Sequence, residues 1–295
     1  MPSDQRRSEA KMTLAVILGT LTVGAATAFA FMPGGPAACI GTNLVAQMQT
    51  KDASMYRQLL AEAESIPNTE AVLWRIERDG QPASHLLGTV HLTDERVTKL
   101  SPAVKQALAE SKIVALERAK KVAPTKVRAK PLHISSPREL FELPDGQKLS
   151  QFFTDEEYAE MDRRMRQLGV PIQRRNSLQP WFVAMRVGIF RPDCEVARRK
   201  AGIKFMDLVV REEGMKNNAE ILGLETKLEN TRALYRLPMA TQVALTKMSL
   251  AKVNRSRDIM QTGIELYQQR RLGMMFSHKL HGVSKQTFDS YIEQL

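Results

Sequence analysis

The chain has 295 residues, which is enough for a sizeable hydrophobic core in one large domain or two small ones. Hydrophobic residues make up 43% and charged residues 25%, which is typical of a globular protein. The net charge of +11 suits attraction to anionic lipid or nucleic acid and says nothing about the fold. Two cysteines, Cys39 and Cys194, exclude both a cysteine-only zinc site and a disulfide framework.

The N-terminus has the pattern of an export segment. Residues 1–11 form a polar region with Arg6, Arg7 and Lys11, and residues 12–32 carry no charge. This predicts a signal peptide, for which Ala28-Phe29-Ala30 offers a cleavage site, or an inner-membrane anchor. A buried core helix is the remaining alternative. The positive charges predict a cytoplasmic N-terminus and a periplasmic body that follows a linker at residues 33–42.

A helix is expected over residues 43–65, followed by a β-hairpin. Residues 72–78 are rich in β-branched and aromatic side chains and read as its first strand, with a turn at Asp79-Gly80. His85-Leu86-Leu87 reads as the second strand.

The hairpin leads into the motif Gly88-Thr89-Val90-His91. Glycine permits a sharp bend and leaves room for a ligand. His91 would then stand at the carboxyl end of a strand, where open α/β sheets gather their ligands. A histidine that caps the strand through hydrogen bonds is the alternative.

Ser101-Pro102 is a helix start, and we expect a helix over residues 103–110. Residues 113–116 form an apolar strand that delivers Glu117. Strand, helix and strand in this order predict a parallel crossover, with His91 and Glu117 at the same sheet edge.

The second half reads mainly as helix. Residues 118–130 are basic and form either a solvated loop or a contact for lipid phosphate or a polyanion. Further expected elements are helices at 155–169, opened by Thr154, and at 178–190, a strand at 219–224 before Glu225, mixed helix over 226–271, and a short helix at 284–295.

Several of these motifs together resemble the TraB/GumN family, which includes the TIKI-type metalloproteases. The matching residues are Leu73-Trp74-Arg75-Ile76, Gly88-Thr89-Val90-His91, the strand ending in Glu117, and Gly223-Leu224-Glu225-Thr226. The resemblance runs from about Cys39 to the C-terminus. It implies an α/β (α+β) fold over residues 43–295, with a mixed β-sheet, strand–helix–strand units and several flanking helices.

The resemblance also implies a metal site. His91, Glu117 and Glu225 would bind a divalent ion such as manganese, cobalt or zinc, with Glu117 or Glu225 as catalytic general base. For either glutamate, a salt bridge with an arginine is the alternative. His278 and His281, three residues apart, are a further metal pair or simply exposed histidines.

We therefore expect a metal-dependent, peptidase-like hydrolase of the bacterial cell envelope. Its substrate would be a peptide, or a polysaccharide as the GumN name suggests. The alternative is a non-catalytic envelope protein that binds anionic lipid or polysaccharide. Nucleotide-binding loops and nucleophile elbows are absent from the sequence, and the export segment argues against nucleic acid as a partner.

Two further expectations concern the C-terminus and the cysteines. Relatives carry a second G-x-x-H motif late in the chain, and nothing after Glu225 has that pattern. This predicts a C-terminally shortened member with weak metal binding. In an oxidising compartment, Cys39 and Cys194 are expected to pair.

Overall fold

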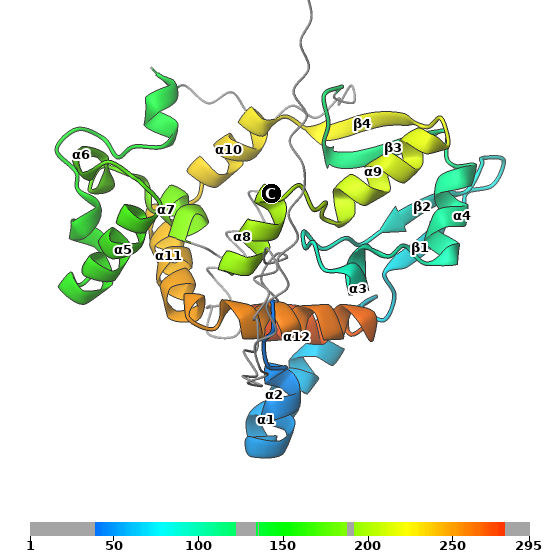
Figure 1. Ribbon diagram of the computed structural model, residues 1–295, viewed down its shortest axis with the longest axis horizontal. Coiled ribbons are helices and arrows are strands. Elements are labelled where there is room, and N and C mark those ends of the chain that lie inside the picture. The colour runs from blue at the N-terminus through cyan, green and yellow to red at the C-terminus, as the bar shows by residue number, and fades with distance from the viewer. Residues whose placement is uncertain (1–38, 122–133, 135, 188–191, 281–295) are drawn as a thin grey trace, which may run out of the picture. The chain divides into compact units, whose positions relative to one another are not determined.

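The computed structural model describes residues 39–121, 134, 136–187 and 192–280 (Figure 1). These residues are mostly helical with two small sheets, which confirms the mixed α/β class. The strands are β1 (Leu73–Ile76), β2 (Ser84–Leu87), β3 (Ile113–Arg118) and β4 (Glu220–Glu225). The helices are α1 (Leu44–Lys51), α2 (Ala53–Glu64), α3 (Glu95–Thr98), α4 (Pro102–Glu110), α5 (Asp155–Gln167), α6 (Ile172–Arg175), α7 (Pro180–Val187), α8 (Asp193–Lys200), α9 (Met206–Lys216), α10 (Lys227–Tyr235), α11 (Met239–Val253), α12 (Ser256–Gln268) and α13 (Leu272–Leu280), with 3-10 turns η1 (Pro137–Leu140) and η2 (Leu149–Phe152).

Several predicted segments lie outside the described residues. These are the polar N-terminus at 1–11, the charge-free segment at 12–32, most of the linker at 33–42 and of the basic stretch at 118–130, and the helix at 284–295. None of the helices in the described part combines the length and the hydrophobicity that a membrane span requires.

The predicted hairpin is present. Strands β1 and β2 pair antiparallel, with Leu73 opposite Leu87 and Ile76 opposite Ser84. Gly80 has φ +71°, a conformation that costs glycine little, which confirms the turn. One further backbone hydrogen bond, from Gly88 N–H to the carbonyl oxygen of Val72 at 2.8 Å, extends the pairing. The loop that carries His91 therefore begins where the hairpin ends.

The second sheet is parallel and brings together distant parts of the chain. Strands β3 and β4 pair with Leu116 opposite Gly223 and Arg118 opposite Glu225. Helix α9 precedes β4 and packs against both strands (Figure 1). Val114 of β3 and Val210 of α9 belong to one buried cluster. Glu117 and Glu225 consequently come from the same end of one sheet.

Two details of the sequence interpretation are wrong. The hairpin and the Glu117 strand were expected to share a crossover sheet, but within the described residues β3 pairs with β4 alone. The parallel partner lies about a hundred residues later, and local periodicity does not encode it. The helix expected over 43–65 is interrupted at Asp52, whose side chain accepts a hydrogen bond from Met55 N–H at 3.0 Å and starts α2.

Helix starts follow the sequence signals closely. Ser101 Oγ accepts a hydrogen bond from Val104 N–H at 3.3 Å and caps α4. Thr154 and Glu157 form a reciprocal capping box at α5. Trp181 is buried and donates from its indole N–H to the carbonyl oxygen of Leu140 at 3.1 Å.

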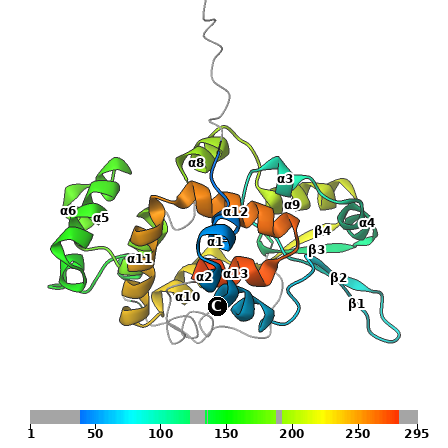
Figure 2. The same ribbon diagram turned by 90° about the horizontal axis from the view of Figure 1, so that it is seen from below.

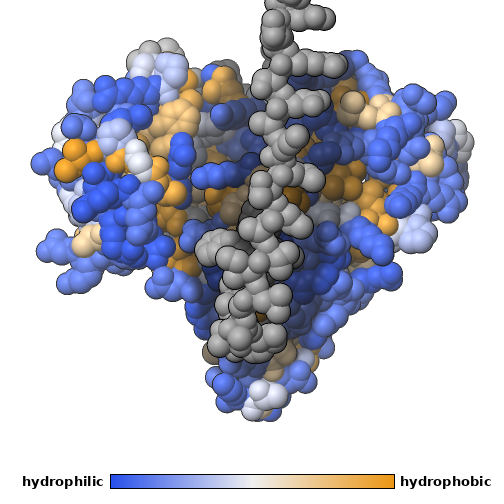
Figure 3. Space-filling view, viewed as in Figure 1, coloured by the Kyte–Doolittle hydropathy of each residue, from blue (hydrophilic) through white to orange (hydrophobic). Residues whose placement is uncertain are grey.

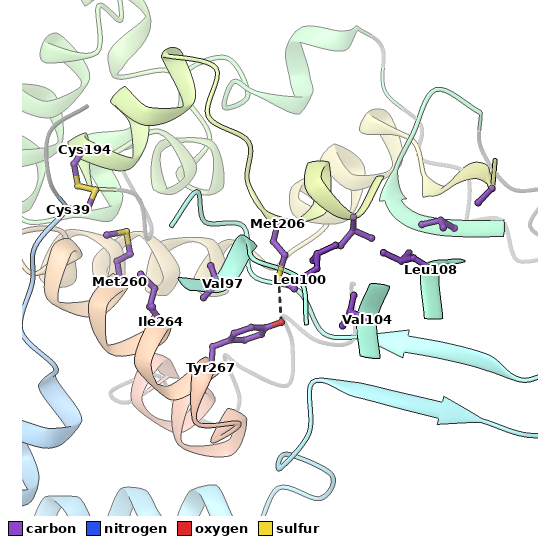
Figure 4. Packing of buried hydrophobic residues seen from close by; sticks show 13 residues of the cluster. Cys39, Val97, Leu100, Val104, Leu108, Cys194, Met206, Met260, Ile264 and Tyr267 are labelled. Atoms are coloured by element: carbon purple, nitrogen blue, oxygen red, sulfur yellow. Dashed lines mark hydrogen bonds between the residues drawn. A yellow bond between two sulfur atoms is a disulfide. The ribbon is translucent and has the colours of Figure 1, made fainter. Parts of the chain in front are cut away.

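Three hydrophobic clusters form the core. The first packs α3, α4, α9 and α12 together through Val97, Val104, Met206, Ile264 and Tyr267 (Figure 4). Val90 and Leu92 of the His91 loop pack against it. The second joins α5 and α7, and the third joins α2 to α12 and α13. Helices α2 and α13 lie side by side in Figure 2. Outside these clusters, hydrophilic residues cover much of the surface seen in Figure 3.

Candidate functional site

The His91 side chain lies between two carboxylates. Its Nε2 atom is 3.4 Å from Glu117 Oε1, and its Nδ1 atom is 3.4 Å from Asp207 Oδ2. Glu117 is the penultimate residue of β3, and Asp207 lies in the first turn of α9. The side chains of His91 and Glu117 are 41% and 61% exposed, whereas that of Asp207 is only 14% exposed. The imidazole is therefore reachable from solvent on the Glu117 side and closed on the Asp207 side.

Helix α8 fixes the backbone around His91. The Arg199 guanidinium donates to the carbonyl oxygen of His91 and pairs with Glu195. Glu195 is fully buried and accepts hydrogen bonds from the Thr93 backbone N–H at 3.2 Å and from the Thr93 hydroxyl at 2.6 Å. Phe205 packs on His91 with ring centroids 5.6 Å apart. The guanidinium carbon of Arg199 lies 4.5 Å from the centroid of the Phe205 ring. These contacts restrict both the loop and the imidazole.

A disulfide holds the same helix. Cys39 and Cys194 are bonded, with a Cα–Cα distance of 5.5 Å, and both residues are buried in the first cluster (Figure 4). Cys194 is adjacent to Glu195 in α8. The cross-link is therefore attached to the residue directly before the glutamate that binds Thr93.

Gly88 does not use the conformational freedom of glycine, while its role of leaving room for a ligand stays a prediction. A Cβ atom there would meet only the Val72 carbonyl oxygen at 3.8 Å, which is ordinary van der Waals contact. Its φ is not in the left-handed region. Its carbonyl oxygen accepts a hydrogen bond from the Tyr267 hydroxyl at 2.7 Å. The backbone of Gly88, rather than its missing side chain, fixes the start of the loop.

Glu225 is the last residue of β4 and is half-buried. Burial raises its pKa above the usual value, a hydrogen bond from Asn230 opposes this shift, and repulsion by Glu117 adds to it. The structure thus places Glu225 within the electrostatic influence of Glu117. Among the described residues, Glu225 forms no ion pair with His91.

The side chains around His91 are of the types that bind divalent cations, but too few of them lie close together for a complete ligand set. An imidazole contacts two carboxylates, a third carboxylate is repelled by one of them, and the buried Asp207 Oδ2 accepts no hydrogen bond. Such uncompensated negative charge favours a cation. Nevertheless, no three His, Cys, Asp or Glu side chains in the described residues are grouped closely enough to hold an ion.

Only the first of the two late histidines lies within the described residues. His278 lies on α13, which packs against α2, whereas residue 281 is outside the described part of the chain. Asp207 is the residue that the sequence interpretation missed, because an aspartate in the first turn of a helix looks like an ordinary dipole partner. Its only sequence signal is the apolar segment around it, which predicts burial of one face.

Comparison with known proteins adds one match. A family model described as the TraB/PrgY/gumN family matches residues 72–295, a range that begins just before β1 and includes His91, Glu117, Asp207 and Glu225. No curated protein and no solved structure matches the chain.

Proposed function

Because the chain belongs to the TraB/PrgY/gumN family, we propose that it is a metal-dependent, peptidase-like hydrolase of the bacterial cell envelope, with His91 at its centre. The observation that carries this proposal is the half-exposed imidazole held between Glu117 and Asp207. A rigid histidine with one ring nitrogen facing solvent and a carboxylate suits ligation or proton transfer.

His91 and Glu117 would hold the ion. A bound divalent ion lowers the pKa of water enough to supply hydroxide near neutral pH. Glu225 suits the role of general base, because its raised pKa brings it closer to the working pH than an ordinary glutamate. Arg199 and Phe205 keep the His91 backbone and ring in place, so that little reorganisation is needed when substrate binds.

The incomplete ligand set supports an open, weak site. Catalytic zinc sites usually have three protein ligands. Among the residues that the structure describes, His91 and Glu117 are the pair in mutual contact on the solvent side. We expect a dissociation constant for manganese, cobalt or zinc well above that of a three-ligand site. Substoichiometric metal after purification follows from this expectation.

We place the body of the protein in the periplasm. The Cys39–Cys194 disulfide supports this placement, since such bonds persist mainly in oxidising compartments. The charge-free segment at residues 12–32 would serve as leader or inner-membrane anchor. A reporter enzyme that works only outside the cytoplasm should be active when fused to the C-terminus. A reporter that works only in the cytoplasm should be inactive at the same position.

The alternative is a non-catalytic envelope protein, favoured by the net charge of +11. Its ligand would be anionic lipid or polysaccharide, held by surface charge. Binding of this kind weakens steeply with salt and does not require His91.

One comparison separates the two functions. Metal content and hydrolysis of a peptide library are measured for the wild type, for His91→Ala and for His85→Ala. His85 is the matched control, because it lines a separate cavity of about 220 Å³ with Arg75 and Glu110. The enzyme proposal expects loss of metal and hydrolysis in His91→Ala alone. Equal values in all three proteins, with salt-sensitive binding to anionic vesicles, would favour the alternative.

A further inference from the structure

Asp207 is oriented toward His91 by a second contact. Its Oδ1 atom accepts a hydrogen bond from the Thr89 hydroxyl at 3.1 Å, and its Oδ2 atom faces His91 Nδ1 at 3.4 Å. Thr89 lies only two residues before His91 in the same loop. One carboxylate thus contacts the loop at two points, and the Thr89 contact determines which oxygen faces the ring.

The Oδ2 atom has an unusual environment for a charged oxygen. It is shielded from solvent and accepts no hydrogen bond within the usual range of about 2.7–3.2 Å. A buried carboxylate oxygen without a donor is costly. The imidazole Nδ1 of His91 lies 3.4 Å from this oxygen. Contacts of this kind are often long in the absence of substrate and shorten when it binds.

A purely structural role for Asp207 is the simpler explanation. Aspartate in the first turn interacts favourably with the helix dipole, and α9 has no side-chain cap from Phe205. That role would be fulfilled equally well by a carboxylate pointing into solvent, as Asp155 does at the start of α5. It does not account for a buried oxygen directed at His91 Nδ1.

We propose that Asp207 is a positioning residue that holds neutral His91 with its proton on Nδ1, so that the lone pair of Nε2 faces Glu117 and the solvent. The hydrogen bond made by one ring nitrogen decides which nitrogen carries the proton. Both neighbouring carboxylates can only accept, but the Glu117 side chain is 61% exposed and can be hydrated, whereas the shielded Asp207 Oδ2 has no other donor among the described residues. This inference deepens the proposed function, because the unprotonated Nε2 is the atom available to a cation or a proton.

The substitution Asp207→Asn gives a sharp test. In the variant, Thr89 still donates to the amide oxygen, which leaves the NH₂ group where Oδ2 faces His91. An amide N–H can only donate to Nδ1 and therefore favours the tautomer protonated on Nε2. The same exchange of carboxylate for amide produces the wrong tautomer in the serine-protease triad.

The tautomer is read by ¹⁵N and ¹³C NMR of the metal-free protein at a pH where His91 is neutral, with its signal identified among the five histidines by His91→Ala. We expect the Nδ1–H tautomer in the wild type and in Asp155→Asn, and the Nε2–H tautomer in Asp207→Asn. An Nε2–H tautomer in the wild type overturns the proposal even if Asp207→Asn fails to fold. An unchanged tautomer in folded Asp207→Ala, which offers Nδ1 no acceptor at this position, overturns it as well.

Cobalt titration of the wild type, Asp155→Asn and Asp207→Asn separates this inference from the proposed function. Loss of a partner behind a metal-binding histidine typically weakens affinity about 10- to 100-fold, and we expect that loss in Asp207→Asn but not in Asp155→Asn. If the wild type shows the Nδ1–H tautomer but binds no cobalt, the positioning role stands and the metal-dependent function fails.

Discussion

The hydroxyl of Tyr267, on α12, donates a hydrogen bond of 2.7 Å to the carbonyl oxygen of Gly88, 179 residues away in the sequence. The same hydroxyl contacts Met206 Sδ at 3.4 Å, directly before Asp207 (Figure 4). One side chain from the core therefore connects the start of the His91 loop to the start of α9. Burial, with a smaller effect of the Asp207 charge, raises the pKa of Tyr267 to about 12.

Tyr267→Phe should lower the free energy of unfolding by about 1 kcal/mol at neutral pH, the usual net value of one hydrogen bond. Its alkaline behaviour is more distinctive. A phenol whose pKa is raised by folding contributes stability below its unfolded pKa of about 10 and loses it as the pH rises toward 12. Denaturant titrations from pH 8 to 11 should therefore show a shallower decline for the variant than for the wild type. Parallel declines would contradict this account.

Gly223→Ala and Gly88→Ala should differ sharply. A Cβ atom at Gly223 would lie 2.5 Å from the backbone nitrogen of Ala119, so β4 must move away from the segment that follows β3. Overpacking of this kind typically costs about 1–3 kcal/mol. Gly88 has room for the same methyl group, and the melting temperature of Gly88→Ala should stay close to that of the wild type. We expect Gly223→Ala alone to slow peptide hydrolysis, since the displacement reaches Glu225, the proposed general base.

Glu160→Gln should reduce stability at neutral pH and flatten the acid transition. The hydrogen bond from Arg163, joined by Arg164, lowers the pKa of Glu160 to about 2. A lowered carboxyl pKa gives stability that is complete above the unfolded pKa of about 4.5 and is lost as the pH falls toward 2. Thermal melts at pH 7, 4 and 3 measure this. Glu64→Gln, at the exposed end of α2, serves as the control with an unchanged profile.

Replacing both Cys39 and Cys194 by serine should destabilise the body substantially. The disulfide closes a loop of 155 residues, for which chain entropy predicts an upper limit of about 5 kcal/mol. Because α8 also carries Glu195 and Arg199, we expect the His91 loop to become protease-sensitive before global unfolding. Limited proteolysis and mass spectrometry locate the first cleavage. If the first cleavage occurs in α5 instead, the disulfide does not stabilise the His91 loop and the prediction is wrong.

Much of the local structure follows from short-range sequence signals. The hairpin turn at Asp79-Gly80, the caps at Ser101 and Thr154, and the apolar strands before Glu117 and Glu225 all appear where the sequence predicts them. These features depend on backbone conformation and hydrogen bonds within a few residues. Local chemistry alone is enough to specify them.

The sequence by itself determined the hairpin, strands β3 and β4 with Glu117 and Glu225 at their ends, several helices and the likeness to a family. It also singled out His91, which lies in the loop after β2 and not at a strand end. Only the tertiary structure decided that β3 pairs with β4 and not with the hairpin, and that Asp207 faces His91 Nδ1. Strand alternation specifies which face is buried but leaves the partner strand open, and the first turn of α9 reads like any other helix start. The contact between Asp207 and His91 arises from packing of α9 on the parallel sheet, which involves residues more than a hundred positions apart.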